Sequence, residues 1–171
     1  MPALDYHDPL FATYAGGQVY EGSFKDARPH GQGVMSYPDG ARYEGEWVEG
    51  KRHGQGSATY ADGSTYVGAF VAGMREGQGE VTMPDGFRYA GTWKAGEIDG
   101  QGIATYPNGD SYEGGFVAGK RQGQGVVRYA TGQESAGAWT GGLLTGPTTP
   151  APADGAAPTG AEAASPDATG N

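Results

Sequence analysis

Tyrosines recur in this chain at a constant spacing of 23 residues. Five of them open successive segments of equal length, without insertion or deletion between residues 20 and 134: Tyr20, Tyr43, Tyr66, Tyr89 and Tyr112. A constant period of this kind indicates a structural unit that stacks against copies of itself. With 34 glycines and 36% hydrophobic residues in a chain of 171, there is too little aliphatic bulk for one globular core.

Each repeat keeps the same glycines and aromatic side chains at the same offsets. The aromatic residues expected to form the core are Tyr20, Phe24, Tyr37, Tyr43, Trp47, Tyr60, Tyr66, Phe70, Tyr89, Trp93, Tyr106, Tyr112, Phe116, Tyr129 and Trp139. The glycines expected to be structural are Gly22, Gly45, Gly54, Gly56, Gly68, Gly77, Gly79, Gly91, Gly100, Gly102, Gly114, Gly123 and Gly125. Glycine is unfavourable inside a strand, so its constant placement needs a reason. We expect the aromatic rings to lie across the bare glycine backbone of neighbouring strands.

The repeats are expected to form β-hairpins. In the second repeat the sequence predicts a strand at 42–48, a loop at 49–53 and a strand at 54–60, followed by a tight turn at 61–63. Antiparallel pairing between successive hairpins then gives the fold class. It is all-β, an elongated single-layer antiparallel sheet of tandem 23-residue β-hairpin repeats with a disordered C-terminal tail.

The register of the repeat also predicts the domain organisation. Residues 1–11 are a lead-in, and 12–142 are the repeat array. The array comprises a half repeat at 12–19, full repeats at 20–42, 43–65, 66–88, 89–111 and 112–134, and a partial capping repeat at 135–142, interpreted as one strand. Residues 143–171, rich in Ala, Pro, Thr and Gly, are expected to be disordered because they cannot bury enough apolar surface.

The segment YEGEW at 43–47, followed by GKRHGQG at 50–56 and the turn YADG at 60–63, resembles the MORN (membrane occupation and recognition nexus) repeat family. The resemblance covers residues 12–142. It implies an elongated sheet of hairpins used as a scaffold or interaction module, often self-associating. Some members are attached to membranes or proposed to bind phospholipids, and in several larger proteins the repeats accompany a catalytic domain such as a phosphoinositide kinase.

Signals of catalysis are weak in this sequence. The repeated GQG does not extend to a phosphate-binding loop. His30 and His53 occupy equivalent positions in successive repeats, about 10 Å apart, so they cannot share a metal ion; later repeats have Glu76, Asp99 and Gln122 there. The sequence suggests no converging acid–base pair or serine triad. We predict a non-enzymatic chain with no cofactor and no metal.

Charges of opposite sign occupy opposite turns of the predicted hairpins. The basic set is Arg28, Lys51, Arg52, Arg75, Lys120 and Arg121, and the acidic set is Asp39, Asp62 and Asp85. The basic set is a candidate edge for docking a protein partner or an anionic lipid. Solvated loop charge is the favoured interpretation, because these basic residues come singly or in pairs, whereas lipid sites cluster several.

The predicted function is a non-catalytic scaffold that binds protein partners along the β-ribbon. Self-association would use an end strand, and the N-terminal strand near Tyr14 is favoured because Pro147, Pro150 and Pro152 oppose strand extension at the other end. The first alternative is a peripheral membrane module that binds anionic phospholipid through the basic residues. The second is a fragment or accessory subunit of an enzyme such as a phosphoinositide kinase relative.

Partners and location follow from charge and hydropathy. A net charge of −9 argues against nucleic acid as a partner. The N-terminus has neither a basic start nor an apolar run of signal-peptide length, and no segment is long enough to span a membrane. A cytoplasmic location is expected, with peripheral membrane contact as the alternative.

Overall fold

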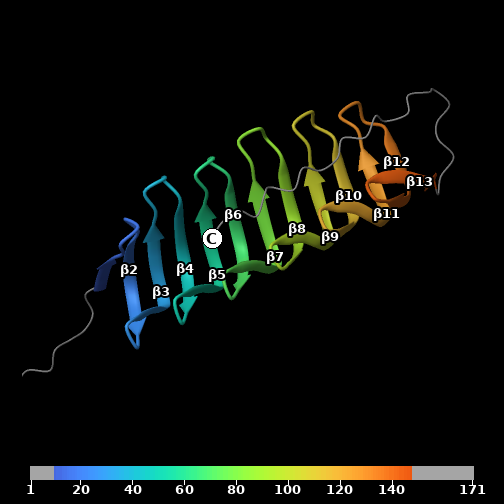
Figure 1. The fold of residues 1–171 in the computed structure, drawn as a ribbon. Helices are drawn as coiled ribbons and strands as arrows, with labels where there is room; N and C mark the ends of the chain where they lie inside the picture. The colour runs from blue at the N-terminus through green and yellow to red at the C-terminus, as the bar shows by residue number, and fades with distance from the viewer. Residues whose placement is uncertain (1–9, 148–171) are drawn as a thin grey trace, which may run out of the picture. The chain divides into compact units, whose positions relative to one another are not determined.

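The computed structural model describes residues 10–147, and these residues form thirteen β-strands without a helix (Figure 1). The strands are β1 (Leu10–Thr13), β2 (Val19–Lys25), β3 (Arg28–Ser36), β4 (Arg42–Val48), β5 (Lys51–Thr59), β6 (Thr65–Val71), β7 (Met74–Thr82), β8 (Arg88–Lys94), β9 (Glu97–Thr105), β10 (Ser111–Val117), β11 (Lys120–Arg128), β12 (Glu134–Thr140) and β13 (Leu143–Pro147). The predicted all-β class of tandem antiparallel hairpins is confirmed.

The chain divides into two compact units, residues 1–74 and 75–171. In the first unit, β1 to β6 pair antiparallel in sequence order. In the second unit, β7 to β13 do the same. Each full repeat consists of a strand of seven residues and a strand of nine, such as β4 and β5.

The turn inside each repeat, called the lower turn from its place in Figure 1, is shorter than the sequence predicted. The predicted loop at 49–53 is wrong, because only Glu49 and Gly50 separate β4 from β5. Their φ angles of 51° and 81° are those of a two-residue type I′ turn, whose twist matches that of the paired strands. The second strand therefore begins at Lys51, three residues earlier than predicted.

The turn between successive repeats, the upper turn, contains the predicted glycine. The Tyr60 N–H donates to the carbonyl of Ser64 at 2.8 Å, and the Gly63 N–H donates to the carbonyl of Tyr60 at 2.9 Å. A carboxylate oxygen of Asp62 accepts a hydrogen bond from the Ser64 N–H at 2.8 Å. Asp39 and Asp85 accept from the backbone in the same way, so the acidic set caps the upper turns.

One glycine in each strand from β2 to β6 and from β7 to β12 faces the next in rows that cross the strands. Four predicted structural glycines lie outside these rows, opposite a ring residue of the next strand: Gly54, Gly77, Gly100 and Gly123. In the first unit the row is Gly22, Gly33, Gly45, Gly56 and Gly68. In the second it is Gly79, Gly91, Gly102, Gly114, Gly125 and Gly137. The opening tyrosine of a repeat lies across this row, since a Cβ added to Gly56 would overlap the ring of Tyr43. Gly102 and Gly125 provide the same space for Tyr89 and Tyr112.

The rings form the buried core on one face of each sheet, here called the inner face. Tyr43 is fully buried and meets Trp47 of its own repeat edge-to-face at 5.0 Å. It also meets Phe70 of the next repeat at 5.1 Å, so the ring contacts join successive hairpins. Edge-to-face pairs contribute roughly 1 kcal/mol each beyond burial. Several predicted core residues are only half-buried: Phe24, Tyr37, Tyr60 and Tyr129.

Hydrogen bonds fix the orientation of these rings. The Tyr43 hydroxyl donates to the carbonyl of Glu46 at 2.9 Å, and the Trp47 Nε1–H donates to the carbonyl of Gly33 at 3.0 Å. The β4–β5 register shifts between Gly45 and Trp47, where Glu46 of β4 lies opposite residues 53–55 of β5. The phenol therefore satisfies a carbonyl of the bulge while its ring covers the glycines.

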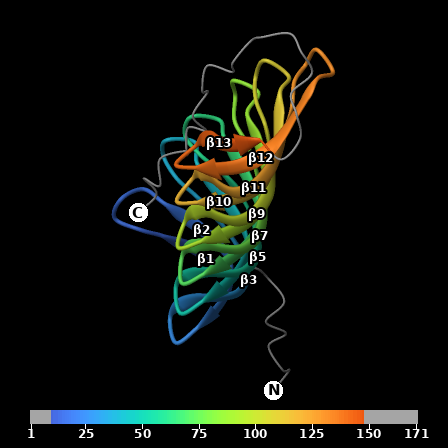
Figure 2. The ribbon, with the colours of Figure 1, turned by 90° about the vertical axis from the view of Figure 1, so that its right-hand side faces the viewer.

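The described chain has a strand at each end that lies partly or wholly outside the predicted array. β1 pairs with β2 and begins at Leu10, inside the predicted lead-in (Figure 2). β13 lies at Leu143–Pro147, inside the predicted disordered tail, and pairs with β12. The last repeat is thus a hairpin rather than a single capping strand. Composition missed this because a short strand needs only a neighbouring edge, not a core of its own. The rest of the predicted lead-in and tail lies outside the described residues.

Replacing Gly56 by valine tests the packing of tyrosine on glycine. The added side chain would displace the Tyr43 ring, and overpacking of this kind costs about 2 kcal/mol. We expect a lower free energy of unfolding in urea. Gly146→Val is the matched control, because a Cβ there meets no atom within 4 Å and its φ is not positive. Equal stability of the two variants would contradict the packing described here.

Candidate functional site

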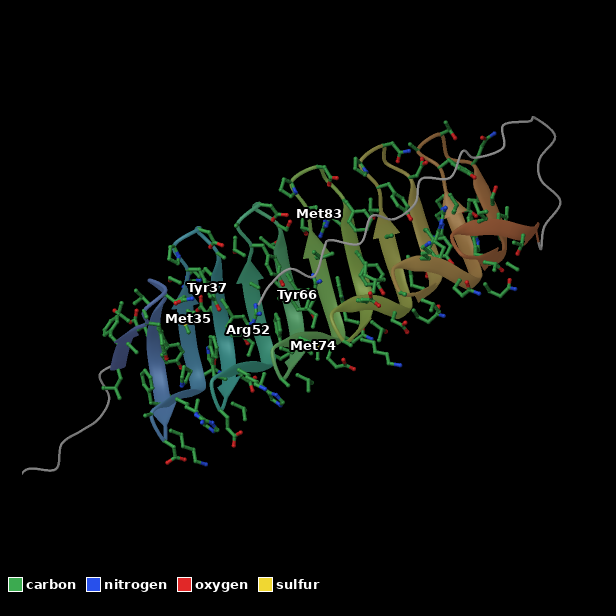
Figure 3. All side chains as sticks on the ribbon, in the orientation of Figure 1. Met35, Tyr37, Arg52, Tyr66, Met74 and Met83 are labelled. Carbon is green, nitrogen blue, oxygen red and sulfur yellow. The ribbon has the colours of Figure 1, made fainter. Side chains whose placement is uncertain are left out.

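The six predicted basic residues do not form a free loop edge. Arg28, Lys51 and Lys120 are the first residues of strands and are exposed. Arg52 is half-buried on the inner face, within 5.8 Å of the Tyr43 ring centroid. Figure 3 places Arg52 and Met74 of the first unit towards the lower turns and Tyr37 towards the upper turns.

Arg75 and Arg121 lie inside the aromatic core, with only 7% and 8% of their surface exposed. The Arg75 guanidinium lies 4.4 Å from the Trp93 ring centroid and donates to the carbonyl of Gly96 at 2.9 Å. Arg121 lies 4.2 Å from the Trp139 centroid and donates to the carbonyl of Gly142 at 2.7 Å. These cation–π contacts and hydrogen bonds hold the lower turns of the following repeat.

The expectation that these arginines are exposed is therefore wrong. Because the strand begins at Lys51, alternation places Arg52 on the same face as Gly54 and Gly56, under the rings. Ile98 occupies the equivalent position in another repeat and is fully buried. The position is a core site that accepts either an aliphatic side chain or a guanidinium.

The two histidines hold the lower turns from a different side. His30 Nδ1 accepts a hydrogen bond from the Glu49 N–H, and His53 Nδ1 accepts one from the Ala72 N–H, both at 3.4 Å. Later repeats place another acceptor there: Glu76 bonds to Ala95, Asp99 to Ala118 and Gln122 to Gly141. The sequence contained this signal, since every residue at the position can accept a hydrogen bond.

Together these contacts make a repeated arrangement that we call the turn clasp. In the example from the first unit, His53 accepts from the Ala72 N–H and the carbonyl of Arg52 accepts from the Gly73 N–H at 2.8 Å. Ala72 has a φ of 49°, which is unfavourable for a residue other than glycine. The clasp holds this residue in place from the preceding repeat.

The face opposite the rings, called the outer face, carries exposed side chains. Several of them are large and apolar, among them Val67 at 58% exposure, Val117 at 53% and Ile103 at 46%. Charged pairs also lie there, such as Arg128 with Glu113 at 2.8 Å, and pairs this exposed stabilise the fold little. A shallow trough crosses β7 to β10 on this face, lined by Gln78, Ala90, Gly91, Thr92, Gln101, Gly102, Ile103, Glu113 and Gly114.

Residues 10–147 contain no cluster of metal ligands and no membrane-spanning helix. No three His, Cys, Asp or Glu side chains come close enough there to hold a metal ion. The same part of the chain has no helix that is long and apolar enough to cross a bilayer.

Comparison with family models identifies the repeats. The MORN repeat model matches residues 20–42, 43–65, 66–88, 89–111 and 112–134. These are the five full repeats read from the tyrosine spacing, and they cover more than half of the chain. The protein belongs to the MORN repeat family, as the resemblance indicated. No curated protein matches the chain.

Two solved structures are similar to this chain. One is the TCP domain of SAS-4 (dCPAP) in complex with a proline-rich motif of Ana2 (dSTIL) from Drosophila melanogaster. It is 16% identical, with 82% of this chain and 84% of that chain covered and a TM-score of 0.48. The other is the TCP10 domain of Danio rerio CPAP in complex with a peptide of STIL, at 13% identity, with 78% and 61% covered and a TM-score of 0.30.

Substitution of Glu76 tests the turn clasp. Glu76→Leu removes the acceptor for the Ala95 N–H, and the loss of one such hydrogen bond should lower the free energy of unfolding by about 1 kcal/mol. Glu76→Gln should preserve stability, because Gln122 makes the equivalent bond. Glu97→Leu, at the exposed first residue of β9, is the control. If Glu76→Gln lowers the free energy of unfolding in urea as much as Glu76→Leu does, the turn clasp is contradicted.

The buried phenols predict a loss of stability at high pH. Burial raises the pKa of Tyr43 to about 12 from its ordinary value of 10.0, and Tyr20, Tyr89 and Tyr112 behave alike. Because the folded state favours the protonated phenol, this contribution is intact below pH 10 and is lost as the pH rises from 10 to 12. Sheet content by circular dichroism and phenolate absorbance should change together in this range. Phenolate formation by these four residues near pH 10 with an intact sheet would contradict the burial described.

Proposed function

We propose that this protein is a non-catalytic scaffold that binds protein partners on the outer face of its sheet. The observation that carries the proposal is the contrast between the two faces. The inner face is filled by packed rings, whereas Val67 and Ile103 stand exposed on the outer face. Exposed apolar side chains among polar ones on a sheet face are suited to protein contact.

The contacts of the charged residues favour this scaffold over a lipid-binding edge. Arg75 and Arg121 support lower turns from within the core, which leaves Arg28, Lys51 and Lys120 as the exposed members of the basic set. Lipid headgroup binding typically uses clusters of four or more basic residues. Phospholipid binding is therefore the second candidate, and no contact in the described residues favours the enzyme-fragment alternative.

Self-association through the N-terminal strand forms part of the proposal. β1 is a short edge strand, and its Leu10 and Phe11 side chains are 49% and 67% exposed. An edge strand with apolar side chains is a ready template for pairing with a second copy. A symmetric pairing of two β1 strands would close the assembly at two chains.

Cross-linking capture from the host cell, with three forms of the protein, tests the scaffold. Wild type should retain a specific protein, the double variant Val67→Glu/Ile103→Glu should lose it, and the control Lys51→Ala/Lys120→Ala should keep it. Introducing charge at a contact centre removes apolar burial and leaves the charge unpaired. Light scattering on the same samples and on Phe11→Glu reports self-association.

The contrary outcomes are distinct. Sedimentation with phosphatidylserine vesicles at low salt that is abolished by Lys51→Ala/Lys120→Ala, without specific protein capture, would support the lipid candidate instead. If the wild type and the Val67→Glu/Ile103→Glu variant capture the partner equally, the outer face is not the binding surface. If light scattering shows that the wild type is a monomer at all concentrations, self-association through β1 is contradicted.

A further inference from the structure

One exposed side chain of the strands is identical in all five full repeats. It is the glutamine between the paired glycines, at Gln32, Gln55, Gln78, Gln101 and Gln124, and each copy is exposed on the outer face. Two residues further along the strand, the outer-face position varies freely, with Ser57, Glu80 and Ile103 among its occupants. Exposed positions of a repeat ordinarily vary in this second way, so the uniform glutamine calls for an explanation.

Hydrogen bonds within the fold do not explain why this glutamine is uniform. The Gln78 Nε2 donates to the Thr92 hydroxyl at 3.1 Å. The side-chain amides of Gln32, Gln55, Gln101 and Gln124 make no hydrogen bond within residues 10–147. Each of these four amides has an NH₂ group that can donate and a carbonyl oxygen that can accept. The five glutamines recur at a constant spacing along the repeats.

In the second unit, two of these amides line the trough on the outer face. Gln78 and Gln101 stand with Thr92 along one side. Ala90, Ile103 and Glu113 stand along the other side, and the glycine row forms the floor. The trough thus crosses the strands, in the direction in which repeats follow one another, and offers amides on one side and an apolar contact at Ile103 on the other.

The spacing of the amides restricts what can lie in the trough. Gln78 and Gln101 are two strands apart, which corresponds to about 9.6 Å. A polyproline II helix advances about 9.3 Å in one turn of three residues, so it presents the same side to each repeat. A β-strand repeats its faces roughly every 6.7 Å and would not stay in register.

The chemistry of the amides points to the same occupant. A polyproline II segment has no internal hydrogen bonds, so all its carbonyls are free. An α-helix uses its carbonyls internally and offers none along its side. We propose that the trough binds a proline-rich partner segment in the polyproline II conformation. One carbonyl per turn accepts from a glutamine Nε2, and proline rings pack on Ile103 and Ala90. This inference rests on the proposed scaffold function and names the class of partner that it takes.

Fluorescence anisotropy with a labelled peptide of repeating Pro-Pro-Thr, about fifteen residues or five turns long, tests the proposal. Wild type should bind it, and Gln78→Ala/Gln101→Ala should bind at least about fivefold more weakly, because two hydrogen bonds are lost. Gln133→Ala, an exposed glutamine at an upper turn, is the matched control and should bind as wild type does. A flexible Gly-Ser-Thr peptide of equal length should bind more weakly than the proline-rich one.

Three results of the peptide assay would overturn the proposal. They are no binding at millimolar peptide, equal affinity of wild type and Gln78→Ala/Gln101→Ala, and equal affinity for the Gly-Ser-Thr peptide. The proposed scaffold function is tested separately. If host-cell capture survives Gln78→Ala/Gln101→Ala but is lost in Val67→Glu/Ile103→Glu, the scaffold stands and the polyproline inference falls.

Discussion

The Tyr43 ring fills the space that a side chain at Gly56 would need, while its hydroxyl donates to the carbonyl of Glu46. Both contacts must be made at once, and this requirement fixes the pairing of the two strands. A slip of one residue would bring Ser57 under the ring, where its side chain has no room. Register, bulge and ring packing therefore depend on one tyrosine with its glycines, and the 23-residue period is the distance over which that arrangement recurs.

The two faces of the sheet have different tasks. On the inner face even charged side chains are used to hold the fold, as Arg75 shows by stacking on Trp93 and bonding the carbonyl of Gly96. Buried guanidinium groups of this kind need the ring and the carbonyl to offset lost hydration. Side chains on the outer face make few contacts that stabilise the fold. Its uniform glutamines and the exposed Ile103 are therefore not explained by folding.

Much of the fold could be predicted from the sequence, because tyrosine spacing and the glycine pairs specify hairpins directly. The lower turn could not be placed by composition, since GKRHGQG reads as loop although its strand begins at Lys51. That error of three residues hid the inward direction of Arg52 and the buried place of Arg75. It also made His53 look like a solvated loop residue, because its bond to Ala72 joins two repeats and no single hairpin contains it.

The turn clasp has a direction. Its acceptor always precedes the turn that it holds, as His53 precedes Ala72 by 19 residues. A ribosome releases the chain from its N-terminus, so every anchor leaves the exit tunnel before the segment that it must secure. The array can thus assemble hairpin by hairpin during translation, each finished unit serving as the template for the one that follows.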